Sequence, residues 1–136
     1  MDTKQWETIC RCAAGEDVGR VPGALKIFHN DTNNPVSYGH VGELGVQIFN
    51  FTHLQPIAEV RRRVGAGVCL MGNVPPLEVL VQGSPEQVRE SGRRCMREHG
   101  GRAGLLLSAG GGVSPGTPGD SVEALMAVVM EESDDA

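Results

Sequence analysis

The stretch GVCLMGNVPPLEVLVQGSPEQVRESGRRCMREHGG, residues 67–101, contains one complete strand–helix unit. Its apolar start, Gly67–Met71, has the length and composition of a strand that is buried on both faces. Glycine, asparagine and two prolines follow in Gly72–Pro76, a pattern typical of a stiff loop. A short apolar helix is predicted over Leu77–Val81.

The second half of this stretch carries the signals of a capped helix. Ser84 can cap the helix, Pro85 suits its first position, and Gln87 lies at the spacing that completes a capping box. The helix is predicted to run to about His99, because Gly100 and a second glycine stop it there.

The same alternation of strand and helix occurs on both sides of this unit. Further strands are predicted at Ala24–His29, Val46–Phe51 and Gly104–Ser108. Further helices are predicted at Val36–Leu44, Pro56–Val64 and Val122–Met130. Four strand–helix units predict an α/β domain with a parallel sheet and helices outside it.

The chain has room for one domain of ordinary size. We assign residues 1–23 to an N-terminal extension of helix and loop, in which residues 4–14 can form a short helix. Residues 24–131 form the βα domain, and residues 132–136 form an acidic tail.

The composition excludes several classes of protein. Hydrophobic residues make up 40% and charged residues 21%, so we expect a folded core. A net charge of −5 gives no basic surface for nucleic acid. No apolar run is long enough for a membrane helix, and the start lacks the apolar stretch of a signal peptide, so we expect a cytoplasmic location.

The four cysteines do not form a disulfide pattern, because no secretory signal precedes them. Cys69 and Cys95 fall within a predicted strand and helix, where we expect reduced core residues. Cys10 and Cys12 form a C-x-C pair, but no second pair at ligand spacing accompanies it, so no metal site is expected there.

Candidate site residues follow from the strand order, because ligands bind at the carboxyl ends of parallel strands. His29, Asn30 and Asp31 come directly after the first strand. His29 can be a metal ligand or a general acid or base, and Asp31 can be a second ligand or the group that orients the imidazole. The alternative is that Asp31 and the neighbouring asparagines only satisfy backbone groups in a turn.

Two further segments provide candidate ligand-binding residues, namely Asn73 and the run Ser108 to Gly112. The Asn73 amide can bind a substrate carbonyl or carboxylate, or it can brace its neighbours. Gly110, Gly111 and Gly112 can present N–H groups to an anion, or they can allow the backbone to pass close to its neighbours. His40 and His53 are weaker candidates, because a helix position and a solvated loop explain them.

Several short motifs together resemble the uroporphyrinogen decarboxylase superfamily, which also contains the cobalamin- and coenzyme M-linked methyltransferases. The motifs are KIFHND (26–31), LMGNVPP (70–76), GSPEQV (83–88) and LLSAGGGVSPGTP (106–118), in the family's order and spacing. The resemblance covers residues 24–130 and implies the C-terminal half of a TIM-type (β/α)8 barrel. The wording of the GNVPP and GGG motifs is closer to the methyltransferase branch.

The sequence departs from that family at the positions of its metal ligands. Zinc methyltransferases of the family have a His-x-Cys after the matching strand and a cysteine in the glycine loop. Here His29, Asp31 and Gly111 stand at those positions, so two thiolates are missing and a zinc site is not expected. The histidine that the decarboxylases carry in the last loop is also absent.

The resemblance implies a domain of a corrinoid-dependent methyltransferase, acting on a small molecule or a corrinoid protein with no tightly bound cofactor. His29 and Asp31 are then the catalytic candidates, and Asn30, Asn73, Ser108 and Gly110–Gly112 the ligand-binding ones. Two alternatives remain: decarboxylation of a tetrapyrrole carboxylate, and a non-catalytic or split-barrel fragment. Four βα units leave open sheet edges, which predicts a homodimer or a complementing N-terminal half-barrel chain.

Overall fold

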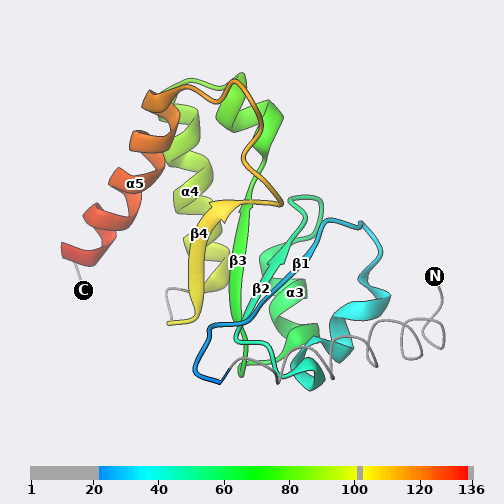
Figure 1. The fold of residues 1–136 in the computed structure, drawn as a ribbon. Helices are drawn as coiled ribbons and strands as arrows, with labels where there is room; N and C mark the ends of the chain where they lie inside the picture. The colour runs from blue at the N-terminus through cyan, green and yellow to red at the C-terminus, as the bar shows by residue number, and fades with distance from the viewer. Residues whose placement is uncertain (1–21, 101–102, 135–136) are drawn as a thin grey trace.

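The computed structural model describes residues 22–100 and 103–134, and within them four parallel strands form one sheet in the order β1-β2-β3-β4 (Figure 1). The strands are β1 (Ile27–Asn30), β2 (Ile48–Phe51), β3 (Cys69–Val74) and β4 (Leu105–Ala109). This arrangement confirms the predicted α/β class and is consistent with a partial barrel. Cys10, Cys12 and the predicted helix at residues 4–14 lie outside the described residues.

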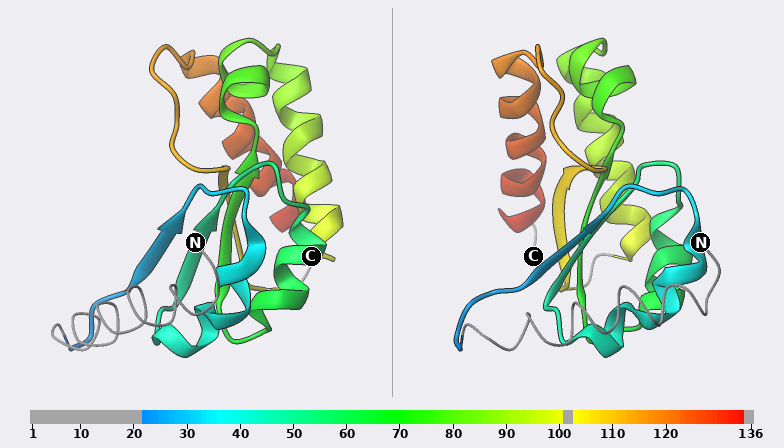
Figure 2. Two further views of the ribbon diagram at one scale, coloured as in Figure 1. Left: turned by 90° about the vertical axis from the view of Figure 1, so that its right-hand side faces the viewer. Right: turned by 45° about the vertical axis from the view of Figure 1, so that its right-hand side comes forward.

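In the same described ranges, helical segments follow each strand, and two of them lie between β3 and β4. They are η2 (Pro35–Leu44), α3 (Ile57–Val64), η3 (Pro76–Val81), α4 (Pro85–His99) and α5 (Gly119–Asp134). The helices gather on one side of the sheet (Figure 2). In the described ranges, no helix has the length and apolar character needed to cross a membrane.

The segment η2 is a 3₁₀ helix, whereas the sequence predicted only a short helix of unspecified type. Its buried apolar residues, Tyr38, Val41 and Leu44, occur every third residue. This spacing matches the three residues per turn of a 3₁₀ helix and places all three side chains on one face. The segment ends at Gly45, which adopts the left-handed conformation at φ 68°.

The helix α4 begins and ends as its sequence predicts. The Ser84 hydroxyl accepts a hydrogen bond from the Gln87 N–H, and the Gln87 side chain accepts one from the Ser84 N–H. These bonds satisfy two of the backbone donors that every helix start leaves unpaired. At the other end, Gly100 adopts φ 89° and donates to the carbonyls of the last turn.

The strand β3 is longer than predicted. The sequence placed Gly72 and Asn73 in a loop, but both lie within β3, and the peptide bond between them is cis. Asn73 and Val74 are in register with Ser108 and Ala109 of β4. Pairing with β4 therefore continues the strand past a glycine that local rules would use to end it.

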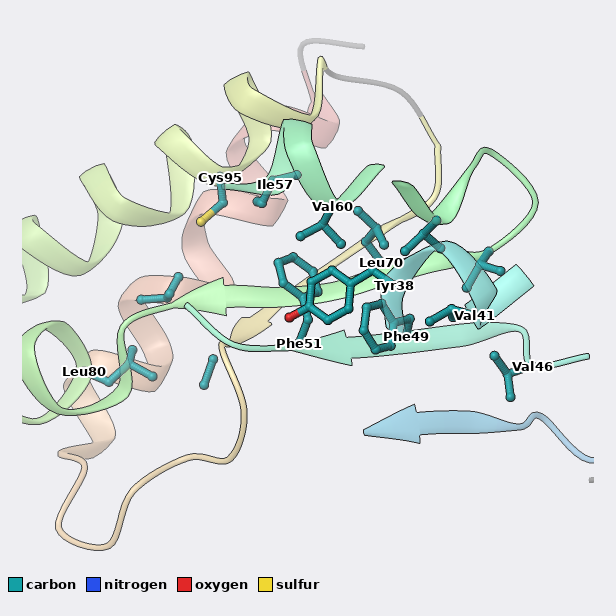
Figure 3. Packing of buried hydrophobic residues seen from close by; sticks show 14 of the residues in the cluster. Tyr38, Val41, Val46, Phe49, Phe51, Ile57, Val60, Leu70, Leu80 and Cys95 are labelled. Atoms are coloured by element: carbon teal, nitrogen blue, oxygen red, sulfur yellow. The ribbon is translucent and has the colours of Figure 1, made fainter. Parts of the chain in front are cut away.

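The core lies between the sheet and the helices that cover it, and its centre is aromatic (Figure 3). Phe49 is fully buried, stacks on Phe28 and Phe51, and meets the edge of Tyr38. These ring pairs connect β1, β2 and η2 at distances typical of favourable aromatic contacts.

The other face of the sheet would line the interior of a complete barrel. His29, Asn50 and Met71 are in register on β1, β2 and β3, so their side chains share this face. Ile27, two residues before His29, also points to it and remains 56% exposed. Within residues 22–100 and 103–134, the sheet is thus covered by helices on one side only.

At the amino ends of β3 and β4, the side chain of Arg61 in α3 binds several backbone segments. Its guanidinium donates to the carbonyls of Gly65 at 2.8 Å, Val68 at 2.7 Å and Gly104 at 2.8 Å. The same group lies 3.0 Å from the His99 Nε2 at the end of α4. One side chain therefore fixes the entries to β3 and β4 and the carboxyl ends of α3 and α4.

We expect Arg61→Gln to lower the free energy of unfolding by roughly 1–3 kcal/mol, because the shorter amide cannot reach carbonyls that the guanidinium now satisfies. Arg62→Gln is the matched control, since Arg62 is 71% exposed in its side chain and pairs with Glu59 on the surface. Denaturant unfolding of both variants measures the difference. Equal midpoints for the two variants would show that the Arg61 contacts contribute nothing beyond a surface ion pair.

Candidate functional site

His29 and Asp31 meet at the carboxyl end of β1. The His29 Nε2 lies 3.2 Å from the Asp31 Oδ2, and both side chains are more than half exposed, at 55% and 56%. An ionised carboxylate accepts hydrogen bonds only, so Nε2 carries the proton in this contact. The second ring nitrogen, Nδ1, is then the acceptor in the neutral imidazole, and it can take up a proton.

The residues around this pair form a tight turn. Asn30 donates to the Ser37 hydroxyl at 3.1 Å and accepts from the Thr32 N–H at 2.9 Å. Asn34 accepts from the Val36 N–H at the start of η2. Asn30 and Asn34 thus have the turn-forming contacts that the sequence offered as an alternative, whereas Asp31 uses its carboxylate on His29.

The loop after β4 crosses toward the ends of β1 and β2. A Cβ atom on Gly110 would meet the backbone N of His53 and would stand 2.7 Å from its Cα. Gly111 has φ 88°, and a Cβ there would meet the Asp31 carboxylate, with the Cγ at 2.8 Å. Close approach therefore explains Gly110 and Gly111, whereas Gly112 has open space around its Cα.

Asn50 is a buried polar residue next to this loop, and the sequence assigned it no role. Its side chain is 3% exposed and donates to the carbonyls of Met71 at 2.9 Å and Ala109 at 3.4 Å. These two acceptors fix the orientation of the amide, and its Oδ1 is buried without a hydrogen-bond partner. An asparagine within the apolar strand VQIFNF was the sequence signal, because buried amides need partners.

Asn73 and Ser108 do not join this cluster. Asn73 is 5% exposed and donates to the Gln55 carbonyl at 2.7 Å, while its Oδ1 accepts from the Cys95 thiol at 3.6 Å. These are the contacts of a bracing residue, the second of the two roles left open. Ser108 lines a groove between β4 and α5. A ligand-binding role for either residue stays a prediction.

The structure brings together the three positions that match the family's zinc ligands, but their chemistry does not fit zinc. His29 and Asp31 are in contact, and Gly111 stands against Asp31. The Asp31 carboxylate occupies the space where a cysteine at position 111 would place its Cβ. Within the described ranges, no group of three histidine, cysteine or acidic side chains could hold a metal ion.

Tyr38 connects the site to the core. Its hydroxyl donates to the Thr32 carbonyl at 3.2 Å, in the turn that follows Asp31. Burial raises the pKa of Tyr38, and the nearby Asp31 carboxylate raises it further because it opposes a second negative charge. Tyr38 therefore stays protonated and supports the turn.

Comparison with protein families finds one match along nearly the whole chain. The model described as uroporphyrinogen decarboxylase (URO-D) matches residues 1–132. A uroporphyrinogen decarboxylase from Synechococcus sp. (strain JA-2-3B'a(2-13)) is 31% identical over 94 residues, which are 69% of this chain and 26% of that protein. One from Magnetococcus marinus is 30% identical over 68% of this chain and 25% of its own length. The chain thus spans about a quarter of the length of these curated relatives.

Among solved structures, a methyltransferase from Methanosarcina mazei has the same fold. The TM-score is 0.84 at 18% sequence identity, and the match covers 96% of this chain and 38% of that one. That similarity establishes the fold alone, and it places the four βα units within a larger barrel-type protein.

We expect Gly110→Ala to destabilise the protein by about 1–3 kcal/mol, because the added methyl group meets the His53 backbone, which cannot rotate away. Gly112→Ala is the control, since open space surrounds Gly112. Thermal and denaturant unfolding of the two variants test this expectation. A Gly110→Ala protein as stable as Gly112→Ala would show that the loop does not pack against His53.

Tyr38 is the one tyrosine in the chain, so its ultraviolet titration reports on the site directly. We expect its pKa to lie above the ordinary tyrosine value, and to fall in Asp31→Asn without returning fully, because burial is the larger cause. The native state holds this proton more tightly than the unfolded state, so stability declines once the pH passes the unfolded-state pKa. An unchanged titration in Asp31→Asn would mean that the carboxylate does not face Tyr38.

Proposed function

This chain belongs to the uroporphyrinogen decarboxylase (URO-D) family, and on that premise we propose that it serves methyl transfer to or from a corrinoid. The observation that carries the proposal is the contact between His29 and Asp31 at the mouth of the sheet. It supplies a general base at the place where α/β barrels bind their substrates.

The chemistry of the pair follows from its hydrogen bond. A methyl acceptor with an acidic proton, such as a thiol, must lose that proton to become a good nucleophile. The His29 Nδ1 takes up the proton while Nε2–H remains bonded to Asp31, whose negative charge stabilises the resulting imidazolium. The thiolate sulfur then forms a bond to the methyl group, and the carbon–cobalt bond of the corrinoid breaks with its electron pair left on the cobalt, while the Nδ1 proton passes to solvent. In the reverse direction the carbon–sulfur bond breaks, and the same nitrogen returns a proton to the thiolate.

No step in this proposal uses zinc. Thiol activation by zinc needs soft ligands, and Asp31 and Gly111 replace both thiolates at the matching positions. The imidazole base takes over the task of removing the thiol proton. The corrinoid is the substrate that carries the methyl group. It can approach His29 because that side chain is about half exposed at an open face of the sheet.

Decarboxylation of a tetrapyrrole carboxylate is the second candidate, favoured by the names of the curated relatives. Such substrates carry several carboxylates, which cationic groups must hold. In the part of the chain that the structure describes, the loops at residues 31–34, 52–56 and 110–118 contain no lysine or arginine. The charge at this mouth therefore favours methyl transfer.

The test compares the two reactions on the purified chain. We expect thiol-dependent demethylation of methylcobalamin, followed by its visible absorbance, and no loss of carboxylates from uroporphyrinogen. Asp31→Asn should lower the demethylation rate on the order of tenfold to a thousandfold. It should change the free energy of unfolding by less than about 1 kcal/mol, because the carboxylate is largely solvated.

Two results would count against the proposal. Turnover of the porphyrinogen without turnover of methylcobalamin would replace it with decarboxylation. An Asp31→Asn protein that unfolds, yet keeps the specific activity of its folded fraction, would make Asp31 a structural turn residue and the site assignment wrong.

A further inference from the structure

Exposed apolar side chains gather at the two lateral edges of the sheet. Leu25 and Ile27, 75% and 56% exposed, lie at β1. At the other edge, Leu106 of β4 is 45% exposed, and Met126 and Met130 of α5 are 60% and 68% exposed. Large exposed apolar side chains at both lateral edges of a sheet indicate that another surface packs against each edge.

The helix α5, next to β4, has two apolar stripes, one buried and one exposed. Its residues Ser121, Ala124 and Val128 are buried where α5 packs on the rest of the domain. A second stripe, Val122, Met126 and Met130, is exposed on another side at helical spacing. A surface helix needs one apolar stripe, so the second one has a further partner to cover it.

Between this stripe and β4 lies an apolar groove of about 500 Å³. Leu107 and Ala109 of β4 form one wall, Leu80 of η3 closes the top, and Met126 and Met130 form the other wall. The backbone of β4 faces the groove with a strand edge that no other described strand pairs with, since β4 is the last strand of the described sheet. A parallel strand with outward apolar side chains fits both the groove and the edge.

A strand of this kind is β1, which lies at the opposite edge of the sheet. The outer edge of β1 is unpaired in the described sheet, and Ile27 lies on it half exposed. Phe28, the next residue, points to the helix side and is only partly buried. The edge strand β1 therefore has the features of the strand that would fit beside β4.

We propose that two copies of this chain close an eight-stranded parallel barrel through a twofold axis, with β1 of each copy inserted between β4 and α5 of the other. One rotation pairs both open edges of both copies, and eight is the number of strands at which side chains fill a barrel interior. The interior then includes Ile27 and Leu106 from each copy.

Charge supports this pairing. The helix α5 runs back along β4, so its carboxyl end lies at the amino ends of the strands (Figure 1). That end has no basic residue in its last turn, and its Glu131 pairs with Arg93 of α4 at 3.0 Å. In the closed barrel, Lys26 of the second copy, which directly precedes its β1, comes to this end and offsets the negative end of the helix dipole.

The pairing also completes the candidate site. His29 and Asp31 lie at the carboxyl end of β1, at the outer edge of the sheet. In the dimer, the carboxyl end of β4 of the second copy stands next to them, and its loop brings Val113, which is 60% exposed in one copy, toward the mouth. A single copy therefore has an incomplete wall around His29.

Light scattering on the full-length chain tests the proposal. We expect a particle of twice the 14.4 kDa chain mass at micromolar concentration. Met126→Glu and Ile27→Glu should each raise the dissociation constant at least about tenfold, because each buries a charge at one edge. Leu54→Glu is the matched control and should leave it unchanged, since Leu54 is 58% exposed but lies in the loop after β2.

Mixing the two disrupted variants distinguishes this arrangement from other dimers. A mixed dimer of Met126→Glu and Ile27→Glu keeps one undamaged interface, so the mixture should regain dimer that neither variant forms alone. Circular dichroism confirms that each variant is folded. A monomeric wild-type chain would overturn the proposal and leave the edges to a different half-barrel protein. An Ile27→Glu variant that dimerises normally would overturn it as well, by showing that β1 is not in the interface.

Discussion

The parallel, in-register pairing of four strands is the constraint on which the candidate site depends. It brings the ends of β1, β2 and the loop after β4 to one end of the sheet, so that Asp31, His53 and Gly110–Gly111 come together from distant parts of the chain. A slip of one residue in β1 would turn His29 toward the helices and Phe28 toward the open face. The aromatic packing of Phe28 on Phe49 opposes that slip.

Close packing then determines what chemistry the site can perform. The Asp31 carboxylate occupies the space that a side chain at position 111 would need, so a larger residue there would require the Asp31 side chain to move. In the zinc enzymes that the sequence resembles, both positions carry cysteines. This chain has instead a carboxylate hydrogen-bonded to an imidazole, an arrangement suited to moving protons.

The described helices cover one side of the sheet. This arrangement explains both the stable core on that side and the exposed apolar residues on the other. Phe49, Phe51 and Leu70 are fully buried between the strands and the helices, and Arg61 holds the far ends of these elements together. On the other side, Ile27 and Leu106 remain exposed although they lie on strands. A half-barrel can build one core from its own residues, but the barrel interior needs residues from both halves.

The sequence by itself determined the local structure. The Ser84–Gln87 capping box and Gly100 set the bounds of α4. It also predicted His29 and Asp31 as candidate site residues, because polar residues directly after an apolar strand mark the mouth of a parallel sheet. The family assignment confirms the resemblance carried by its motifs.

Only the tertiary structure decided how distant residues use each other. The extension of β3 through Asn73 depends on β4, the amide of Asn73 braces Gln55 and Cys95, and Asn50 reaches a carbonyl 59 residues away. None of these contacts leaves a local pattern, since the partners are close only once the sheet has formed. Sequence periodicity reports which face of an element is buried, whereas the partner on that face is set by the packing of the whole domain.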